Sequence, residues 1–102
     1  MTEYRLSIGL FDKDSKTQEI TTEAARADIA RSAADLFGGC SITPGLGAYV
    51  HDDGATVFEP CLIVSIYADD ADAGRVQAFR DGLKKSLNQE EIYINVYQFA
   101  SI

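Results

Sequence analysis

The residues best suited to chemistry in this chain are its single histidine and the acidic residues beside it. His51 stands directly before two aspartates and Gly54, an order typical of a tight turn between two strands. A metal site needs several converging ligands, and Cys40 and Cys61 do not have the spacing of zinc ligands. We therefore interpret His51 as a solvated turn residue and predict no metal site.

Two further segments that could bind a ligand have simpler structural explanations. The glycine-rich segment 45–47 lacks the Gly-Lys-Ser/Thr of a phosphate-binding loop, and no helical pattern starts there. The acidic segment 69–72 precedes a helical pattern, where carboxylates cap a helix, and it lacks the spacing of a calcium-binding loop. No catalytic constellation remains, so the sequence predicts a protein that is not an enzyme and that uses no cofactor.

Composition narrows the class of protein. The 102 residues are 46% hydrophobic and 25% charged, which fits one globular domain spanning residues 1–102. Nine basic against sixteen acidic residues give a net charge of −7, which disfavours a nucleic-acid partner. We find no signal-like start and no apolar segment long enough for a membrane. We therefore expect a cytoplasmic protein with reduced cysteines and no membrane partner.

Four segments have the pattern of strands. Residues 4–11 and 92–97 alternate between apolar and polar side chains, as half-buried strands do. Residues 40–50 and 61–67 flank the turn, and the second of these is almost wholly apolar, which predicts a central strand covered on both faces. Pro44 cannot donate to a sheet ladder, so its segment is predicted to be an edge strand.

Two segments have the pattern of amphipathic helices. The first is expected to begin at Thr21 or Thr22, which can accept a backbone N–H, and to end at Gly38. The second follows the acidic segment 69–72, and its apolar residues recur at helical spacing: Val76, Phe79, Leu83 and Leu87.

The resulting order, βαββαβ, is that of the α+β ferredoxin-like fold, a four-stranded antiparallel sheet with two helices on one face. Right-handed crossovers place the first and third strands in the centre. We expect the helices to cover one face of the sheet, including Ile94 and Val96. The other face then carries a large apolar and aromatic surface, which predicts a homo-oligomer. The predicted interface residues are Ile63, Tyr67, Tyr93, Tyr97 and Phe99.

The hairpin around residue 51 is expected to project from the sheet edge and to reach a neighbouring subunit. Clefts at such boundaries collect small molecules, and a few polar groups with one aromatic ring suffice for a nucleotide-like ligand. The net negative charge means that an anionic ligand would need local cations. The predicted ligand-binding residues are Arg5, Lys13, Lys16, Tyr49, His51 and Glu59.

Three stretches carry a resemblance to known proteins: residues 8–20, residues 47–54 running into 57–59, and residues 83–90. Together they resemble a family of small uncharacterised proteins from phages and bacterial mobile elements, and more distantly a bacterial domain family of unknown function (DUF3574-like). The resemblance covers most of the chain, and it implies no activity and no catalytic residue. It does imply a role in host interaction or in evading host defence.

The sequence therefore predicts a non-catalytic, small-molecule-binding homo-oligomer that sequesters a nucleotide-like signal in an anti-defence role. The alternative is an acidic interaction module that blocks a host protein. Such a module would need only the acidic surface itself, whereas the small-molecule function needs the cationic residues to converge on one cleft.

Overall fold

The structure is a computed structural model that describes residues 1–50 and 52–100. The predicted order of strands and helices is confirmed, with one short 3-10 turn added before the second helix. The elements are β1 (Thr2–Gly9), α1 (Thr22–Phe37), β2 (Ser41–Val50), β3 (Thr56–Ala68), η1 (Asp70–Asp72), α2 (Ala73–Ser86) and β4 (Tyr93–Gln98).

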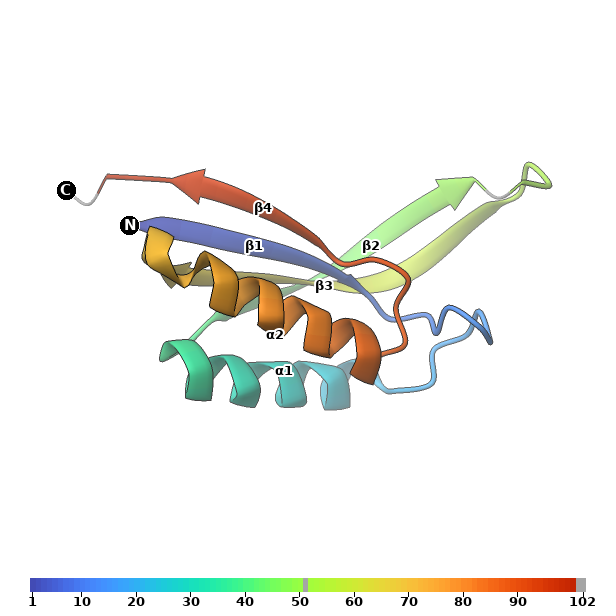
Figure 1. The fold of residues 1–102 in the computed structure, drawn as a ribbon. Helices are drawn as coiled ribbons and strands as arrows, with labels where there is room; N and C mark the ends of the chain where they lie inside the picture. Colours follow the sequence, from blue (N-terminus) through green and yellow to red (C-terminus); the bar gives the residue numbers. More distant parts are fainter. Residues whose placement is uncertain (51, 101–102) are drawn as a thin grey trace.

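The four strands form one antiparallel sheet in the order β2-β3-β1-β4. Both helices lie on the same face of this sheet (Figure 1). The first and third strands are central, and the strand that contains Pro44 is at an edge, as the sequence predicts. The ferredoxin-like α+β fold is therefore confirmed.

The first helix begins and ends where its capping residues indicate. Thr21 is the N-cap, and its hydroxyl accepts the Ala24 N–H at 3.1 Å. Gly38 ends the helix with a φ of 85°, a left-handed conformation that glycine adopts without a steric penalty. The residues of α1 that face the sheet are mostly small, so the helix can approach it closely: Ala25, Ile29 and Ala33 are buried.

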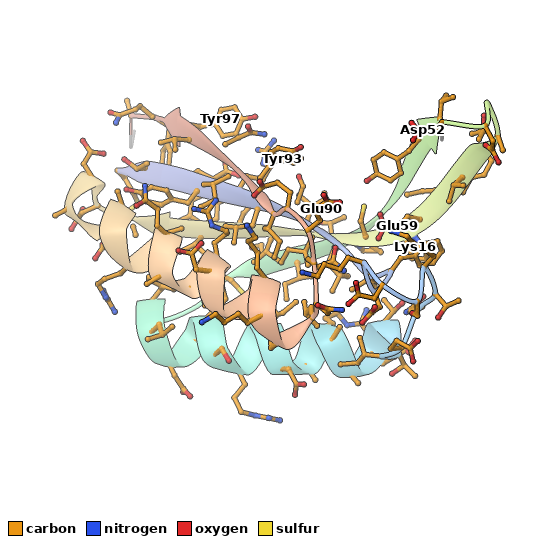
Figure 2. The ribbon with its side chains drawn as sticks, turned by 45° about the vertical axis from the view of Figure 1, so that its right-hand side comes forward. Lys16, Asp52, Glu59, Glu90, Tyr93 and Tyr97 are labelled. Atoms are coloured by element: carbon orange, nitrogen blue, oxygen red, sulfur yellow. The ribbon has the colours of Figure 1, made fainter. Side chains whose placement is uncertain are left out.

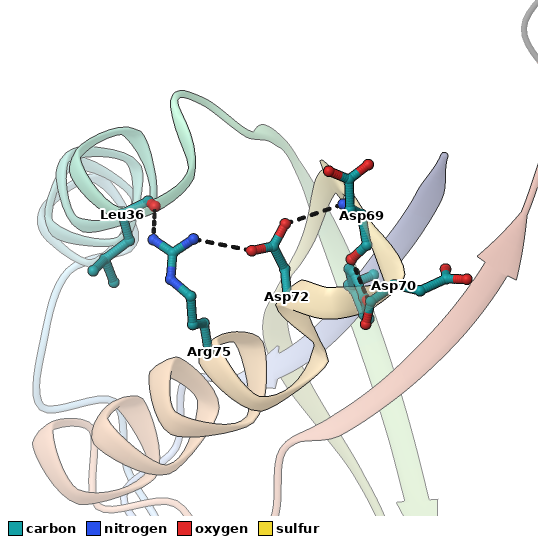
Figure 3. A network of polar contacts seen from close by, with 6 residues as sticks. Leu36, Asp69, Asp70, Asp72 and Arg75 are labelled. Carbon is teal, nitrogen blue, oxygen red and sulfur yellow. Dashed lines mark hydrogen bonds and ion pairs between the residues drawn. The ribbon is translucent and has the colours of Figure 1, made fainter.

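The acidic segment 69–72 caps the second helix and also links it to the first. The Asp72 carboxylate accepts the Asp69 N–H at 3.1 Å and pairs with Arg75 at 3.0 Å. Arg75 in turn donates to the carbonyl of Leu36 near the end of α1 (Figure 3). The structural explanation of this acidic segment is thus supported, because the carboxylates of Asp70 and Asp72 and the backbone of Asp69 form hydrogen bonds within the fold.

The core lies between the sheet and the two helices. The side chains of Leu6, Ile8, Leu62, Val64 and Ile66, from the two central strands, are fully buried. Val96 lies on the helix-facing side of the sheet, as expected, because it pairs with the buried Tyr4, but it is 57% exposed. The physical reason is its place on the edge strand β4, where an open groove remains between β4 and α2.

The hairpin of β2 and β3 extends beyond the rest of the sheet (Figure 1). The last residue of β1, Gly9, pairs with Cys61, so residues 56–60 of β3 pair only with β2. We call residues 46–50 and 56–60 the hairpin arm. The arm contributes to the elongated shape of the molecule, which measures 47 × 24 × 21 Å. No helix in the described part of the chain is long and apolar enough to cross a membrane.

Candidate functional site

A cleft of about 590 Å³ lies where the hairpin arm leaves the body of the molecule. This volume falls within the range of about 300–1,000 Å³ that is usual for ligand sites. In Figure 2, Glu59 and Lys16 lie at the base of the arm, Glu90 belongs to the segment that leads into β4, and Tyr93 begins that strand. We call it the arm cleft, and its lining residues are Phe11, Asp12, Lys13, Lys16, Tyr49, Val50, Asp53, Ala55, Val57, Glu59, Gln89, Glu90, Glu91 and Tyr93.

Glu59 is one of two half-buried acidic residues in this cleft, and the end of β1 holds its carboxylate in place. After Gly9 the chain leaves the strand, and the Leu10 N–H donates to the Pro60 carbonyl at 3.1 Å. The next N–H, that of Phe11, donates to Glu59 Oε2 at 2.7 Å. This charge-assisted hydrogen bond fixes one carboxylate oxygen of Glu59 beside the cleft.

Tyr49 lies beside Glu59 on the neighbouring strand, with an exposed ring and a partly covered hydroxyl. Burial raises the pKa of Tyr49, and the nearby Glu59 carboxylate raises it further, because a negative neighbour disfavours the phenolate. Tyr49 therefore remains a neutral hydroxyl that can donate a hydrogen bond. Tyr93 adds a second ring to the cleft wall, and its side chain is 68% exposed.

The loop that carries Lys13 and Lys16 is held firmly against the end of α2. The Asp12 carboxylate accepts the N–H groups of Asp14 at 2.8 Å and Ser15 at 2.9 Å, as well as the Asn88 amide at 2.9 Å. The Ser15 N–H is the largest of the influences that lower the pKa of Asp12. Both lysines therefore lie in a hydrogen-bonded loop at the edge of the arm cleft, and the Lys16 ammonium donates to the Lys13 carbonyl at 2.5 Å.

The charges of the arm cleft favour a ligand with positive charge. Five carboxylates line it, from Asp12, Asp53, Glu59, Glu90 and Glu91, against the two ammonium groups of Lys13 and Lys16, for a net charge of −3. A cleft of one sign concentrates ligands of the opposite sign. A phosphate-bearing nucleotide is therefore disfavoured relative to a nucleoside that carries a cationic group.

Four of the six predicted ligand-binding residues line this cleft: Lys13, Lys16, Tyr49 and Glu59. The structure does not bring Arg5 to this cleft, because Arg5 lies on the open face of the sheet. Its guanidinium pairs with Glu3 at 2.9 Å and stacks 4.6 Å from the centre of the Tyr97 ring. The sixth predicted residue, His51, lies outside the described residues.

Sequence reasoning missed the residues that close the cleft opposite the arm. Glu90, Glu91 and Gln89 precede β4, and Tyr93 was assigned only to the oligomer interface. A signal was present, because neighbouring antiparallel strands place the end of β1 and the start of β4 at the same end of the sheet. Among residues 1–50 and 52–100, no group of three acidic, histidine or cysteine residues is arranged to hold a metal ion.

The predicted interface residues lie on the sheet face that the helices leave open. Tyr67, Tyr93, Tyr97 and Phe99 are 40–68% exposed, and Ile63 is half-buried. Tyr67 and Phe99 contact each other edge to face, with ring centres 5.8 Å apart. This aromatic surface exists as predicted, and its role in self-association stays a prediction.

No protein-family model and no curated protein matches this chain. Solved structures do match it. A phage SAM lyase in complex with S-methyl-5'-thioadenosine matches with a TM-score of 0.72 and 22% identity over 95% of this chain and 80% of that one. A phage SAM lyase in the apo state matches with a TM-score of 0.72 and 23% identity over 94% of this chain and 78% of that one. CutA from Synechococcus elongatus PCC7942, complexed with Bis-Tris, matches with a TM-score of 0.63 and 17% identity over 99% of this chain and 84% of that one.

At these identities the matches establish a shared fold. They also correct the prediction that the protein is not an enzyme, since two of the matching structures are of a lyase. That prediction rested on the lack of a familiar nucleophile, base or metal motif. An enzyme that acts by holding its substrate in a reactive geometry requires no such motif.

Proposed function

We propose that the protein is an enzyme that binds a sulfonium nucleoside of the S-adenosylmethionine class in the arm cleft and cleaves its carbon–sulfur bond. The observation that carries this proposal is the combination of a net negative cleft with the two exposed rings of Tyr49 and Tyr93. The shared fold with a phage SAM lyase that binds methylthioadenosine supports it.

Each part of such a substrate has a matching group in the cleft. The sulfonium and the ammonium are cationic, and Glu59 with its neighbouring carboxylates would attract both. The adenine ring is flat and apolar on its faces, so a tyrosine ring can stack against it. Lys13 and Lys16 offset part of the negative charge, so that the cleft does not reject the carboxylate of the substrate.

The proposed reaction is an intramolecular displacement. A carboxylate oxygen of the substrate attacks its own γ-carbon, and the electron pair of the broken carbon–sulfur bond returns to sulfur. The products are methylthioadenosine, a neutral thioether, and homoserine lactone. No proton changes place, so the reaction needs no general base. The contribution of the protein is to hold the carboxylate and the γ-carbon in the reactive geometry.

Product release follows from the same electrostatics. The substrate carries the sulfonium charge, whereas methylthioadenosine has lost it. The attraction between the cleft carboxylates and the nucleoside therefore ends when the bond breaks, and the cleft binds substrate more tightly than this product.

The proposal is tested by incubating the protein with S-adenosylmethionine and identifying both fragments by mass spectrometry. We expect methylthioadenosine and homoserine lactone in equal amounts, above a control with heat-denatured protein. An unsaturated amino acid in place of the lactone would indicate elimination by a base and would contradict the proposed displacement. No product above the control would contradict the proposed activity.

We further propose that the active form is a homo-oligomer built on the aromatic surface of the open sheet face. The arm cleft supports this, because Tyr49 and Tyr93 are about half or more exposed, and a second subunit would cover them. In the phage or mobile-element setting that the sequence resemblance implies, consumption of a methyl donor would serve the anti-defence role.

One observation favours the alternative of a protein-interaction module. Leu46 and Phe58 of the hairpin arm are 68% and 59% exposed, which is unusual for large apolar side chains on an unsupported hairpin. Retention of a host protein by the wild-type chain, lost on Phe58→Ser, with no turnover of S-adenosylmethionine, would support this alternative.

A further inference from the structure

Two glycines lie directly beneath the two central side chains of the arm cleft. A β-carbon placed on Gly9 would meet Glu59 Oε2 at 2.6 Å and Glu59 Cδ at 2.8 Å. A β-carbon on Gly47 would meet the Tyr49 hydroxyl oxygen at 2.7 Å and its ring carbons at 3.0 and 3.2 Å. Real β-carbons essentially never approach another atom to less than 3.0 Å, so Glu59 and Tyr49 can hold these positions only over glycine.

The backbone itself does not require glycine at either position. The described glycines with positive φ are Gly38, Gly39 and Gly54, so Gly9 and Gly47 have ordinary strand conformations. A residue with a β-carbon could therefore adopt the backbone conformation at either position without strain. What glycine supplies at these positions is room above the sheet.

The sheet register explains why both glycines serve one site. Gly47 pairs with Glu59 across β2 and β3, and Tyr49 is two residues further along the same face of β2. Tyr49 therefore folds back over Gly47 toward the carboxylate. Gly9 is the last residue of β1, and the Glu59 carboxylate extends across it to reach the Phe11 N–H at 2.7 Å.

We propose that Gly9 and Gly47 are positioning residues, whose missing side chains let Glu59 and Tyr49 lie along the sheet and point into the arm cleft. This inference rests on the proposed function of that cleft. In both cases the obstructing atoms belong to the far end of a side chain that can swing away. An alanine therefore displaces the carboxylate or the hydroxyl and leaves the strand pairing intact.

The test uses Gly9→Ala and Gly47→Ala, with Gly45→Ala as the matched control. Gly45 lies in the same strand as Gly47, and its β-carbon would meet Cys61 Sγ at 2.9 Å, outside the residues that line the cleft. We expect both test variants to lose up to about a hundredfold in kcat/KM for S-adenosylmethionine. Their circular dichroism spectra should remain those of the wild type, and Gly45→Ala should retain activity.

A double-mutant cycle separates positioning from a general effect on the fold. If Gly9 acts through Glu59, then Gly9→Ala should have no further effect on kcat/KM or on melting temperature in a Glu59→Ala background. The same holds for Gly47→Ala in a Tyr49→Ala background. An equal loss in both backgrounds would overturn the proposal, since the glycine would then act without the side chain above it.

A readout that needs no ligand keeps this inference distinct from the proposed function. The Phe11 N–H donates to the Glu59 carboxylate, so we expect its hydrogen exchange to accelerate in Gly9→Ala and in Glu59→Ala alike. If the wild type cleaves nothing, the proposed function fails, and the Phe11 exchange rate still decides the positioning. Unchanged Phe11 exchange in Gly9→Ala would overturn the inference.

Discussion

The substitution Glu59→Gln removes one negative charge from the arm cleft and changes almost nothing else. The glutamine oxygen can still accept the Phe11 N–H that now bonds Glu59 Oε2 at 2.7 Å, so the side chain can keep its place. A ligand that carries a sulfonium should lose affinity. A neutral ligand of the same shape should bind nearly as before.

The magnitude follows from the interaction of two charges. At a separation of about 4 Å their attraction is about 1 kcal/mol in bulk water and about 4 kcal/mol at an effective dielectric constant near 20. Glu59 is half-buried, so its environment lies between these limits. At about 1.4 kcal/mol per factor of ten, the affinity for S-adenosylmethionine should fall between about fivefold and several hundredfold.

The assay is isothermal titration calorimetry with two ligands that the protein does not cleave. One is S-adenosylhomocysteine, which is neutral at sulfur, and the other is an analogue of S-adenosylmethionine in which a protonated amine replaces the sulfonium and keeps its charge. Affinity for the neutral compound should change by less than about threefold, within the range of an exchanged neutral hydrogen bond. Glu23→Gln is the control, because it makes the same change in net charge from the exposed first turn of α1, away from the cleft. Equal losses for both ligands, or no loss for either, would refute the electrostatic reasoning.

Four further predictions concern stability, pH and assembly. Leu6→Ala, at a fully buried position, should lower the free energy of unfolding in urea by about 2–5 kcal/mol, and a loss below about 1 kcal/mol would contradict the assigned core. Gly82→Ala should raise it by about 0.5–1 kcal/mol, because the added β-carbon meets nothing within 4 Å in the α2 interior; destabilisation would count against the assigned helix. The pKa of Asp12 is lowered from its ordinary 3.8, first by the Ser15 N–H, so ionised Asp12 stabilises the fold above that pH and ceases to do so as the pH falls through the lowered value. Asp12→Asn should therefore flatten the acid side of a urea-unfolding series, and an unchanged slope would be inconsistent with this. Light scattering should give a multiple of 11.1 kDa for the wild type and a smaller mass for Tyr97→Asp; a wild type that is monomeric at all concentrations would exclude the oligomer.

Most of the fold could be predicted from local sequence patterns, because the spacing of apolar residues shows which side chains pack in the core and the capping residues show where a helix ends. The alternation in residues 4–10 matches the buried side of β1, and Thr21 and Gly38 mark the ends of α1. Val96 faces the helix side as predicted but is exposed, because alternation shows only which side of a strand a residue faces. It does not show how far a helix on another part of the chain extends over that side.

The candidate site was only partly predictable, since it depends on which side chains neighbouring strands bring together. Tyr49 and Glu59 could be found from the hairpin pairing. Arg5 was misplaced because Glu3, on the same face of β1, and Tyr97, on the adjacent strand, already hold its guanidinium. The roles of Gly9 and Gly47 could not be read from spacing, because the need for room arises only when Glu59 and Tyr49 are placed in three dimensions.

The central claim is that the arm cleft is where an adenosine-containing ligand binds, and nuclear magnetic resonance with methylthioadenosine tests it most directly. Methylthioadenosine is a product of the proposed reaction, so the protein does not cleave it. Its binding can therefore be followed at equilibrium in spectra of the labelled protein. We predict that the backbone amide signals of Phe11, Gly47 and Glu59 shift together as the compound is added, with little change in α1. Shifts confined to other surfaces, or none at saturating compound, would contradict the account.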